Sequence, residues 1–362
     1  MRKLTLILEN GMTFEGCGFG ADGDITGEIV FTTGMTGYLE TLTDPSYHGQ
    51  IVLQTFPLIG NYGVIPSDFE SASVGPKAYI VKTPCPEPSN FRSEGALGTF
   101  LKDKGIVGLC GIDTRALTKI IREQGVMNGR ITKLKPDAVL LEEIRAHYIK
   151  NAVKNVSCEK PALYRAEGAK FTVALLDYGL KENIKQELLK RGCHVWVLPC
   201  DTPPEEVTAL VPDGIMLSNG PGDPADNPIV IRHLKAMMQK DIPMFGICLG
   251  HQLLALAGGF KTQKMKYGHR GANQPVKDLK TGRVYISSQN HGYTVTTESI
   301  DEHLAETWFV NVNDRTCEGI LYRNSLAFSV QFHPEACAGP QDTAFLFDLF
   351  IEKMEGRKYA AR

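Results

Sequence analysis

The sequence predicts an α/β protein of two domains: a C-terminal domain with a doubly wound, mostly parallel sheet and a separate, β-rich mixed α/β N-terminal domain. The chain has 362 residues, which suits two domains of ~100–200 residues each. From residue 171 onward, apolar runs alternate with segments of helical spacing, as in a parallel sheet covered by helices. Before residue 160, short apolar runs are separated by glycine and proline, which is typical of short strands and turns.

The first part of the chain, residues 1–168, is expected to be the N-terminal domain. Short strands are predicted at 28–32 and 50–54, and helices are predicted after Asp113 and over 136–150. The stretch 155–170 contains Pro161 and Gly168 and is expected to be a linker. We therefore place the domain boundary near residue 168.

The second part, residues 169–362, begins with the continuous apolar run 171–176, which is typical of a strand buried on both faces. Helical spacing follows over 180–191 and stops at Gly192. Further strands are predicted at 195–198, 214–217 and 242–247, and further helices at 228–240 and 249–257. After residue 261 strand-like runs continue to residue 332, and a last helix is predicted over 340–354.

Composition excludes several classes of protein. There are 39 basic and 41 acidic residues, a net charge of −2, which argues against a general nucleic-acid binder. No stretch approaches 18 apolar residues, and the apolar run within residues 1–9 is too short for a signal peptide, so we expect a cytoplasmic protein without a membrane segment. The nine cysteines include no C-x-x-C pair, so neither a disulfide framework nor a metal site is expected.

Cys248 is the candidate nucleophile. An apolar strand runs into Gly246-Ile247-Cys248-Leu249-Gly250 and then directly into a helix, which matches the logic of a nucleophile elbow. Glycines permit the sharp turn, and the helix N-terminus favours the thiolate. The alternative is a buried structural cysteine in a turn between glycines.

His333 is the candidate base and Glu335 the group that orients it. A strand-like run ends in His333-Pro334-Glu335, where proline ends the strand and the carboxylate can accept the imidazole N–H. His333 lies 85 residues after Cys248, so the contact is tertiary. A satisfied surface histidine is the alternative, and His291 and His251 are rival bases, although His251 is badly placed three residues beyond the nucleophile.

The loop 218–224, rich in glycine and proline, follows a predicted buried strand. Such a loop can present backbone N–H groups where negative charge develops on a cleaved amide. We therefore propose the amides of Gly220 and Leu249 as an oxyanion hole. The alternative is a tight turn without a ligand, and the spacing matches neither phosphate-binding loop pattern.

Together, segments 219–224, 246–252 and 332–335 resemble class I (triad) glutamine amidotransferases. This resemblance covers roughly residues 170–357 and implies a Cys-His-Glu triad that forms a γ-glutamyl thioester on Cys248 and releases ammonia. The segments 26–38, 43–50 and 57–63 resemble the N-terminal domain of carbamoyl phosphate synthetase small chains. With both halves matched, the resemblance covers nearly the whole chain.

The resemblance also implies the residues that contact L-glutamine, with Ser46 coming from the first domain, so that glutamine is expected at the domain interface. Lys181 is expected to help with substrate charge, and Tyr293 stands where some relatives have phenylalanine. The expected glutamine contacts are Ser46, Gly220, Gly222, Leu249, Gln252, Asn290, Gly292 and Tyr293.

The implied partner is the carbamoyl phosphate synthetase large subunit. That subunit is expected to bind ATP and magnesium and to combine ammonia with bicarbonate for arginine or pyrimidine biosynthesis, whereas this chain is expected to carry no cofactor. Two alternatives remain. One is a stand-alone γ-glutamyl cysteine hydrolase, against which the N-terminal domain argues. The other is a non-catalytic glutamine-binding subunit, against which an intact Cys248, His333 and Glu335 argues.

Overall fold

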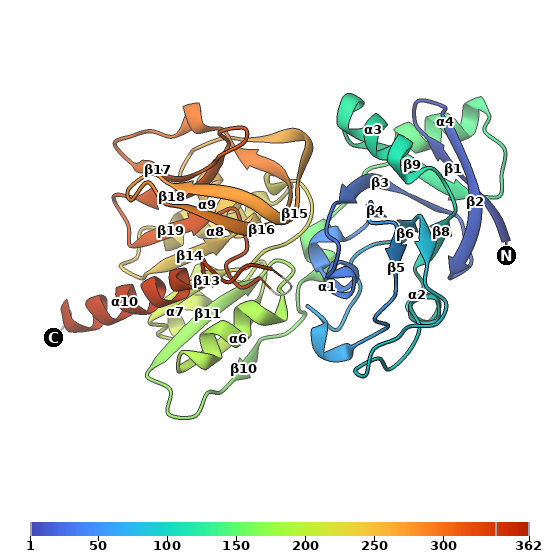
Figure 1. Ribbon diagram of the computed structural model, residues 1–362. Coiled ribbons are helices and arrows are strands. Elements are labelled where there is room, and N and C mark those ends of the chain that lie inside the picture. Colours follow the sequence, from blue (N-terminus) through green and yellow to red (C-terminus); the bar gives the residue numbers. More distant parts are fainter. Residues whose placement is uncertain (1, 337–338, 361–362) are drawn as a thin grey trace. The chain divides into compact units, whose positions relative to one another are not determined.

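The computed structural model of the protein describes residues 2–336 and 339–360 (Figure 1). The chain divides into two compact units, Met1–Ala152 and Val153–Arg362. Each unit has its own buried apolar clusters. The two-domain prediction therefore agrees with the packing, although the division falls before the predicted boundary near residue 168.

The first unit contains a closed barrel with the strand order β1-β2-β8-β6-β4-β3-β9. Antiparallel pairing of β1 with β9, which places Leu6 opposite Ile131, closes it. Strand closure leaves no unpaired edge. The strands are β1 (Arg2–Leu8), β2 (Thr13–Gly20), β3 (Ile25–Thr32), β4 (Ile51–Gln54), β6 (Ala78–Val81), β8 (Val107–Cys110) and β9 (Met127–Thr132).

Helices pack on this barrel. The helix predicted after Asp113 is confirmed, because the Asp113 carboxylate accepts a hydrogen bond from the amide of Ala116 (2.9 Å) and caps the helix. The helices are α1 (Tyr38–Thr43), α2 (Leu97–Asp103), α3 (Thr114–Gln124) and α4 (Ala138–Arg145); α5 (Ala152–Val156) spans the division between the units. The minor elements are η1 (Pro45–Tyr47), η2 (Pro66–Asp68) and a small sheet of β5 (Leu58–Ile59) and β7 (Thr83–Pro84).

The second unit is built on a ten-stranded sheet with the order β10-β12-β11-β13-β14-β19-β18-β17-β15-β16. Strands β12, β11, β13, β14 and β19 run parallel to one another. The remaining neighbouring pairs in the sheet are antiparallel. The strands are β10 (Ala162–Tyr164), β11 (Phe171–Asp177), β12 (Cys193–Pro199), β13 (Gly214–Leu217), β14 (Met244–Ile247), β15 (Thr262–Asp278), β16 (Val284–Val295), β17 (Ala305–Asn311), β18 (Cys317–Tyr322) and β19 (Ala327–Val330).

Both faces of the parallel strands are covered, as the doubly wound prediction requires. Leu234 of α8 and Leu253 of α9 belong to one buried cluster, while Leu188 of α6 and Phe347 of α10 belong to the other. The helices are α6 (Glu182–Lys190), α7 (Pro204–Ala209), α8 (Pro228–Met237), α9 (Leu249–Ala257) and α10 (Phe345–Ala360), with 3-10 turns η3 (Pro224–Asp226) and η4 (Thr297–Ser299).

Two elements differ from the sequence-based prediction. The expected linker 155–170 contains β10, which pairs antiparallel with β12 and therefore belongs to the second unit. The last helix begins at Phe345 and not at Pro340. Within the described residues, no helix combines the length and the apolar character that crossing a membrane requires.

Candidate active site

Cys248 lies between the end of β14 and the start of α9. Its backbone has φ 54° and ψ −102°, a conformation that residues with a side chain rarely adopt and that is found mainly at functional sites. The amide of Cys248 donates to the carbonyl of Val330 (2.9 Å), and its carbonyl accepts from the amide of Gln252 (3.2 Å). Hydrogen bonds to the neighbouring strand and to the following helix therefore hold Cys248 in this strained conformation.

The flanking glycines are required by close backbone contacts. A Cβ at Gly246 would lie 2.8 Å from the carbonyl oxygen of Gly250. A Cβ at Gly250 would lie 2.4 Å from the carbonyl oxygen of Leu217, in β13. Both distances are below van der Waals contact, so the turn and the seating of α9 on the sheet depend on the missing side chains.

His333 and Glu335 follow the end of β19 and are almost completely buried. Nδ1 of His333 and Oε1 of Glu335 are 2.6 Å apart, a short hydrogen bond. The amide of His333 donates to the carbonyl of Ser288 (2.9 Å), which ties the turn to β16. The predicted orientation of the imidazole by the carboxylate therefore has the required geometry.

The electrostatics of this pair favour the protonated imidazole. Burial is the largest single effect and lowers the pKa of His333, but Glu335 and Cys248 together outweigh burial and raise the pKa to about 10. Burial raises the pKa of Glu335, yet His333 and then Lys181 bring it below its usual value. The pair is thus an imidazolium and a carboxylate at neutral pH.

Cys248 and His333 come together because β14 and β19 are neighbours. The two strands are parallel, with Ile247 opposite Val330, so the residues after their carboxyl ends meet at one edge of the sheet. Cys248 is among the groups that raise the pKa of His333. The thiol of Cys248 also contacts the carbonyl oxygen of Asn290 (3.6 Å).

The rival histidines are engaged elsewhere. Nδ1 of His251 lies 2.8 Å from the hydroxyl of Ser329, and burial lowers the pKa of His251 to about 3. Nδ1 of His291 lies 2.7 Å from the carbonyl of Tyr293, and burial lowers its pKa far below the ordinary value. Both rings are therefore neutral, in contrast to His333.

Several of the predicted glutamine contacts surround Cys248. Nε2 of Gln252 donates to the carbonyl of Tyr293 (2.8 Å) and to Oε1 of Gln331 (2.9 Å), and Asn290 contacts the thiol. Gly292 follows Asn290 by two positions in β16.

The proposed oxyanion loop lies against the start of α9. A Cβ at Gly220 would lie 2.2 Å from the carbonyl oxygen of Tyr178 and 2.8 Å from a methyl of Leu249, so Gly220 and Leu249 are neighbours and Gly220 tolerates no side chain. Gly222, on the same loop, has a positive φ of 87°. Ser46 belongs to the first unit, in η1, where its amide donates to the Asp44 carboxylate (2.8 Å).

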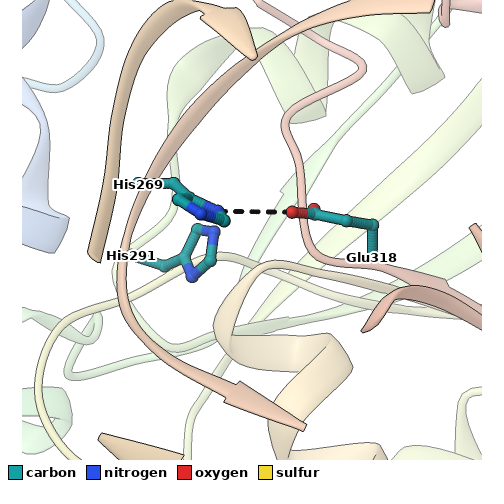
Figure 2. Close-up of side chains that lie close together, drawn as sticks. All are labelled: His269, His291 and Glu318. Atoms are coloured by element: carbon teal, nitrogen blue, oxygen red, sulfur yellow. Dashed lines mark ion pairs between the residues drawn. The ribbon is translucent and has the colours of Figure 1, made fainter. Parts of the chain in front are cut away.

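Sequence reasoning missed Gln331, a buried side chain that binds Gln252. Its position two residues before His333 in the strand-like run of the sequence was the available signal, because alternate residues of an extended segment share a face, although β19 itself ends at Val330. It also missed a group of buried side chains from three strands. His269 of β15, His291 of β16 and Glu318 of β18 converge (Figure 2), with one nitrogen or oxygen of each within 4.8 Å of the others.

Comparisons with known proteins match both units. Residues 6–131 match the family model of the carbamoyl-phosphate synthase small chain, CPSase domain, and residues 174–353 match that of glutamine amidotransferase class-I. The carbamoyl phosphate synthase small chain of Bacillus cereus (strain ATCC 10987 / NRS 248) is 50% identical over 357 residues, covering 98% of this chain and 97% of the relative.

Two further matches are of different kinds. The carbamoyl phosphate synthase pyrimidine-specific small chain of Halalkalibacterium halodurans is 49% identical over 361 residues and covers 99% of both chains. Among solved structures, a glutamine amidotransferase from Thermotoga maritima aligns with a TM-score of 0.38 and 19% identity, covering 52% of this chain and 85% of the other.

Proposed function

The chain belongs to the family of carbamoyl-phosphate synthase small chains, the glutamine-hydrolysing subunits of that enzyme, and we propose that Cys248, His333 and Glu335 are its catalytic triad. The adjacency of β14 and β19 carries this proposal. Because the two strands are neighbours, the thiol of Cys248 at its strained turn lies beside the imidazole of His333, which the buried Glu335 carboxylate holds at 2.6 Å. That is the geometry of an activated nucleophile with its base and orienting group.

The chemistry follows from the charge state of the pair. Protonated His333 stabilises the thiolate of Cys248, which attacks the side-chain amide carbon of glutamine. Negative charge develops on the amide oxygen, and the amides of Gly220 and Leu249 stabilise it. The C–N bond breaks as His333 gives its proton to the leaving nitrogen, so ammonia departs and a γ-glutamyl thioester remains.

The second half of the reaction regenerates the thiol. Neutral His333 now takes a proton from water, and the resulting hydroxide attacks the thioester carbon. The C–S bond breaks and the sulfur leaves as a thiolate beside the reprotonated His333, while the new γ-carboxyl group gives its proton to solvent and glutamate departs. Glu335 holds the same ring nitrogen throughout, so the other nitrogen serves first as acid and then as base.

Glutamine binding is proposed for Ser46 of the first unit and for a group of residues of the second unit, with Lys181 close enough to influence the pKa values of His333 and Glu335. Gln252 and Asn290 offer amide groups, and Gly292 leaves room for backbone approach. The proposed contacts are Ser46, Gly220, Gly222, Leu249, Gln252, Asn290, Gly292 and Tyr293.

We further propose that ammonia passes to a carbamoyl phosphate synthase large subunit, which holds ATP and magnesium and makes carbamoyl phosphate for arginine or pyrimidine biosynthesis. Small-chain matches along the whole length support this partner, and they lend no support to a stand-alone γ-glutamyl hydrolase. A cytoplasmic location is proposed as well, because the eight cysteines in the described residues carry free thiols, which suits a reducing compartment.

Replacing Cys248 with serine tests the proposal in the complex with the large subunit. A serine hydroxyl is a far weaker nucleophile than a thiolate, so glutamine-dependent synthesis of carbamoyl phosphate is expected to disappear. Ammonia-dependent synthesis is expected to persist. C85S, which changes a thiol of the first unit, is the control and should retain both activities. Equal loss of both activities in C248S would remove Cys248 from the assigned role.

A further inference from the structure

The buried side chains of His269, His291 and Glu318 lie outside the proposed triad, but they are linked to the strand segment beside Cys248. Nε2 of His269 donates to the Asp314 carboxylate (2.9 Å), and Nδ1 lies 3.3 Å from Oε1 of Glu318. Figure 2 shows this second contact, with His291 beneath the ring of His269. Glu318 is fully buried and Asp314 is partly exposed. The imidazole therefore joins an inner and an outer carboxylate.

His269 carries a positive charge at neutral pH. Burial alone lowers its pKa, but the hydrogen bonds to Asp314 and Glu318 raise the pKa of His269 to about 9. Its charge matters for Glu318, because a buried carboxylate that loses its partner is strongly unfavourable. Asn311 adds a neutral hydrogen bond to Oε1 of Glu318 (3.2 Å).

Glu318 is connected to the strand segment that contacts the thiol. Its Oε2 accepts a hydrogen bond from Nε2 of Gln289 (3.0 Å). Gln289 is followed in β16 by Asn290, whose carbonyl oxygen contacts the sulfur of Cys248. The neutral ring of His291 donates from Nδ1 to the carbonyl of Tyr293 (2.7 Å), which also accepts from Nε2 of Gln252.

The strand segment 289–293 lies between two irregularities of the antiparallel ladder of β15 and β16, which fall between Lys264 and His269 and between Gly271 and Gln274. Irregularities of this kind leave residues out of the regular ladder. Three consecutive pairs lie between them, His269 with His291, Arg270 with Asn290 and Gly271 with Gln289, so side-chain contacts add to a short run of backbone pairing.

We propose that His269 is a positioning residue for glutamine hydrolysis: held between Asp314 and Glu318, it fixes the backbone of segment 289–293 against Cys248 through Glu318 and Gln289. The inference rests on the proposed role of Cys248. The proposal treats His269 and Glu318 as a charge pair and not as ligands of a metal, because Nδ1 of His269 lies 3.3 Å from Oε1 of Glu318, which also accepts from Asn311.

Two substitutions of His269 separate its two contacts. The amide nitrogen of asparagine falls near the position of Nδ1 and keeps a donor toward Glu318. The longer glutamine places its amide nitrogen near Nε2 and keeps a donor toward Asp314 only. If Glu318 transmits the effect, H269N should retain more function than H269Q, although the two side chains are chemically alike.

The experiment uses the complex with the large subunit and measures glutamine-dependent and ammonia-dependent synthesis. For H269Q we expect kcat/KM for glutamine to fall by roughly tenfold or more, mainly through KM, because displacement of site groups by a fraction of an ångström has effects of this size. Ammonia-dependent synthesis should be unchanged, and H269N should lie between H269Q and wild type. D314N, which alters the outer carboxylate, should change kcat/KM by less than H269Q.

Three results would overturn the proposal. The first is wild-type kinetics in H269Q, and the second is a matching loss of ammonia-dependent synthesis, which would indicate a general structural role. The third is stoichiometric zinc in the purified complex whose removal by a chelator reproduces the H269Q kinetics. C248S, assayed in parallel, distinguishes failure of the His269 proposal from failure of the proposed function. If C248S keeps glutamine-dependent synthesis, the proposed function itself fails.

Discussion

At the scale of single residues, the charge of His333 depends mainly on Glu335. Burial lowers the pKa of His333, Glu335 makes the largest contribution that raises it and Cys248 adds to that rise; Glu335 also supplies the short hydrogen bond at Nδ1. The same carboxylate therefore controls both the orientation of the ring and the pH range in which the ring carries a proton. Acid catalysis at the leaving nitrogen requires that proton.

Substitution of Glu335 with glutamine should expose this dependence. The carboxylate that raises the pKa of His333 is lost, while burial and Lys181 still lower it, so the ring loses its proton at a lower pH than the wild-type value of about 10. We expect kcat for glutamine-dependent synthesis at neutral pH to fall by roughly a hundredfold or more. The alkaline limb of the pH–kcat profile should move to lower pH.

The matched control is E352Q, an exposed glutamate of α10. It removes the same charge far from any catalytic contact and should leave the profile in place. An E335Q profile whose alkaline limb coincides with wild type would show that His333 does not define that limb.

Sequence reasoning reaches the candidate residues whose local context is distinctive. Cys248 stands between glycines at a strand-to-helix junction, and His333 stands at a strand end beside a proline and an acid. The network around His269 has no such context, because its hydrogen bonds join β15, β16 and β18 across up to 49 positions of chain. Those pairings depend on strand register, which alternates side chains between faces and is not visible in one sequence.

At the scale of elements, the junction of β14 and α9 positions Cys248, the proposed nucleophile. Gly250 brings the helix against β13 at a distance that no side chain permits. The strained backbone of Cys248 persists because bonds from Val330 and Gln252 hold it. The position of α9 on the sheet and the backbone conformation of Cys248 therefore depend on each other.

Replacing Gly250 with alanine should disturb both the packing of α9 on the sheet and the backbone conformation of Cys248. The new Cβ would lie 2.4 Å from the Leu217 carbonyl oxygen, and overpacking of this kind costs about 1–3 kcal/mol. We expect a lower midpoint of thermal unfolding together with reduced glutamine-dependent synthesis. G258A, at the end of the same helix, has its nearest neighbour at 3.4 Å and should be close to neutral. Unchanged unfolding in G250A would refute the steric argument.

Elements with strong periodicity were predicted well, and the exceptions have physical reasons. Strand β13 and helix α9 have the predicted bounds, because an uninterrupted apolar run and a glycine-bounded helix mark their ends. Strand β10 lies inside the predicted linker 155–170, because Pro161 and Gly168 in that stretch favour a linker and the short strand between them has no fully buried residue. The barrel of the first unit could not be foreseen, since closure rests on the pairing of β1 with β9.

At the scale of the whole molecule, Ser46 is the predicted glutamine contact that belongs to the first unit. Its replacement by alanine should raise the KM for glutamine more than it lowers kcat, because lost substrate positioning is mainly lost binding. Steady-state kinetics of the complex measure both. S73A, an exposed serine of the same unit, is the control. An unchanged KM in S46A would remove Ser46 from the site.

The place of β19 in the sheet has a consequence for how the enzyme is made. This strand lies between β14 and β18, so the sheet edge that carries the proposed nucleophile is completed by residues that come after β18 in the chain. A ribosome adding ~5–20 residues per second needs roughly 4 to 17 s to go from Cys248 to His333, 85 residues later. During translation, the nascent chain has the thiol of Cys248 before it has the proposed acid and base, so we expect no glutamine hydrolysis until His333 and Glu335 have been added.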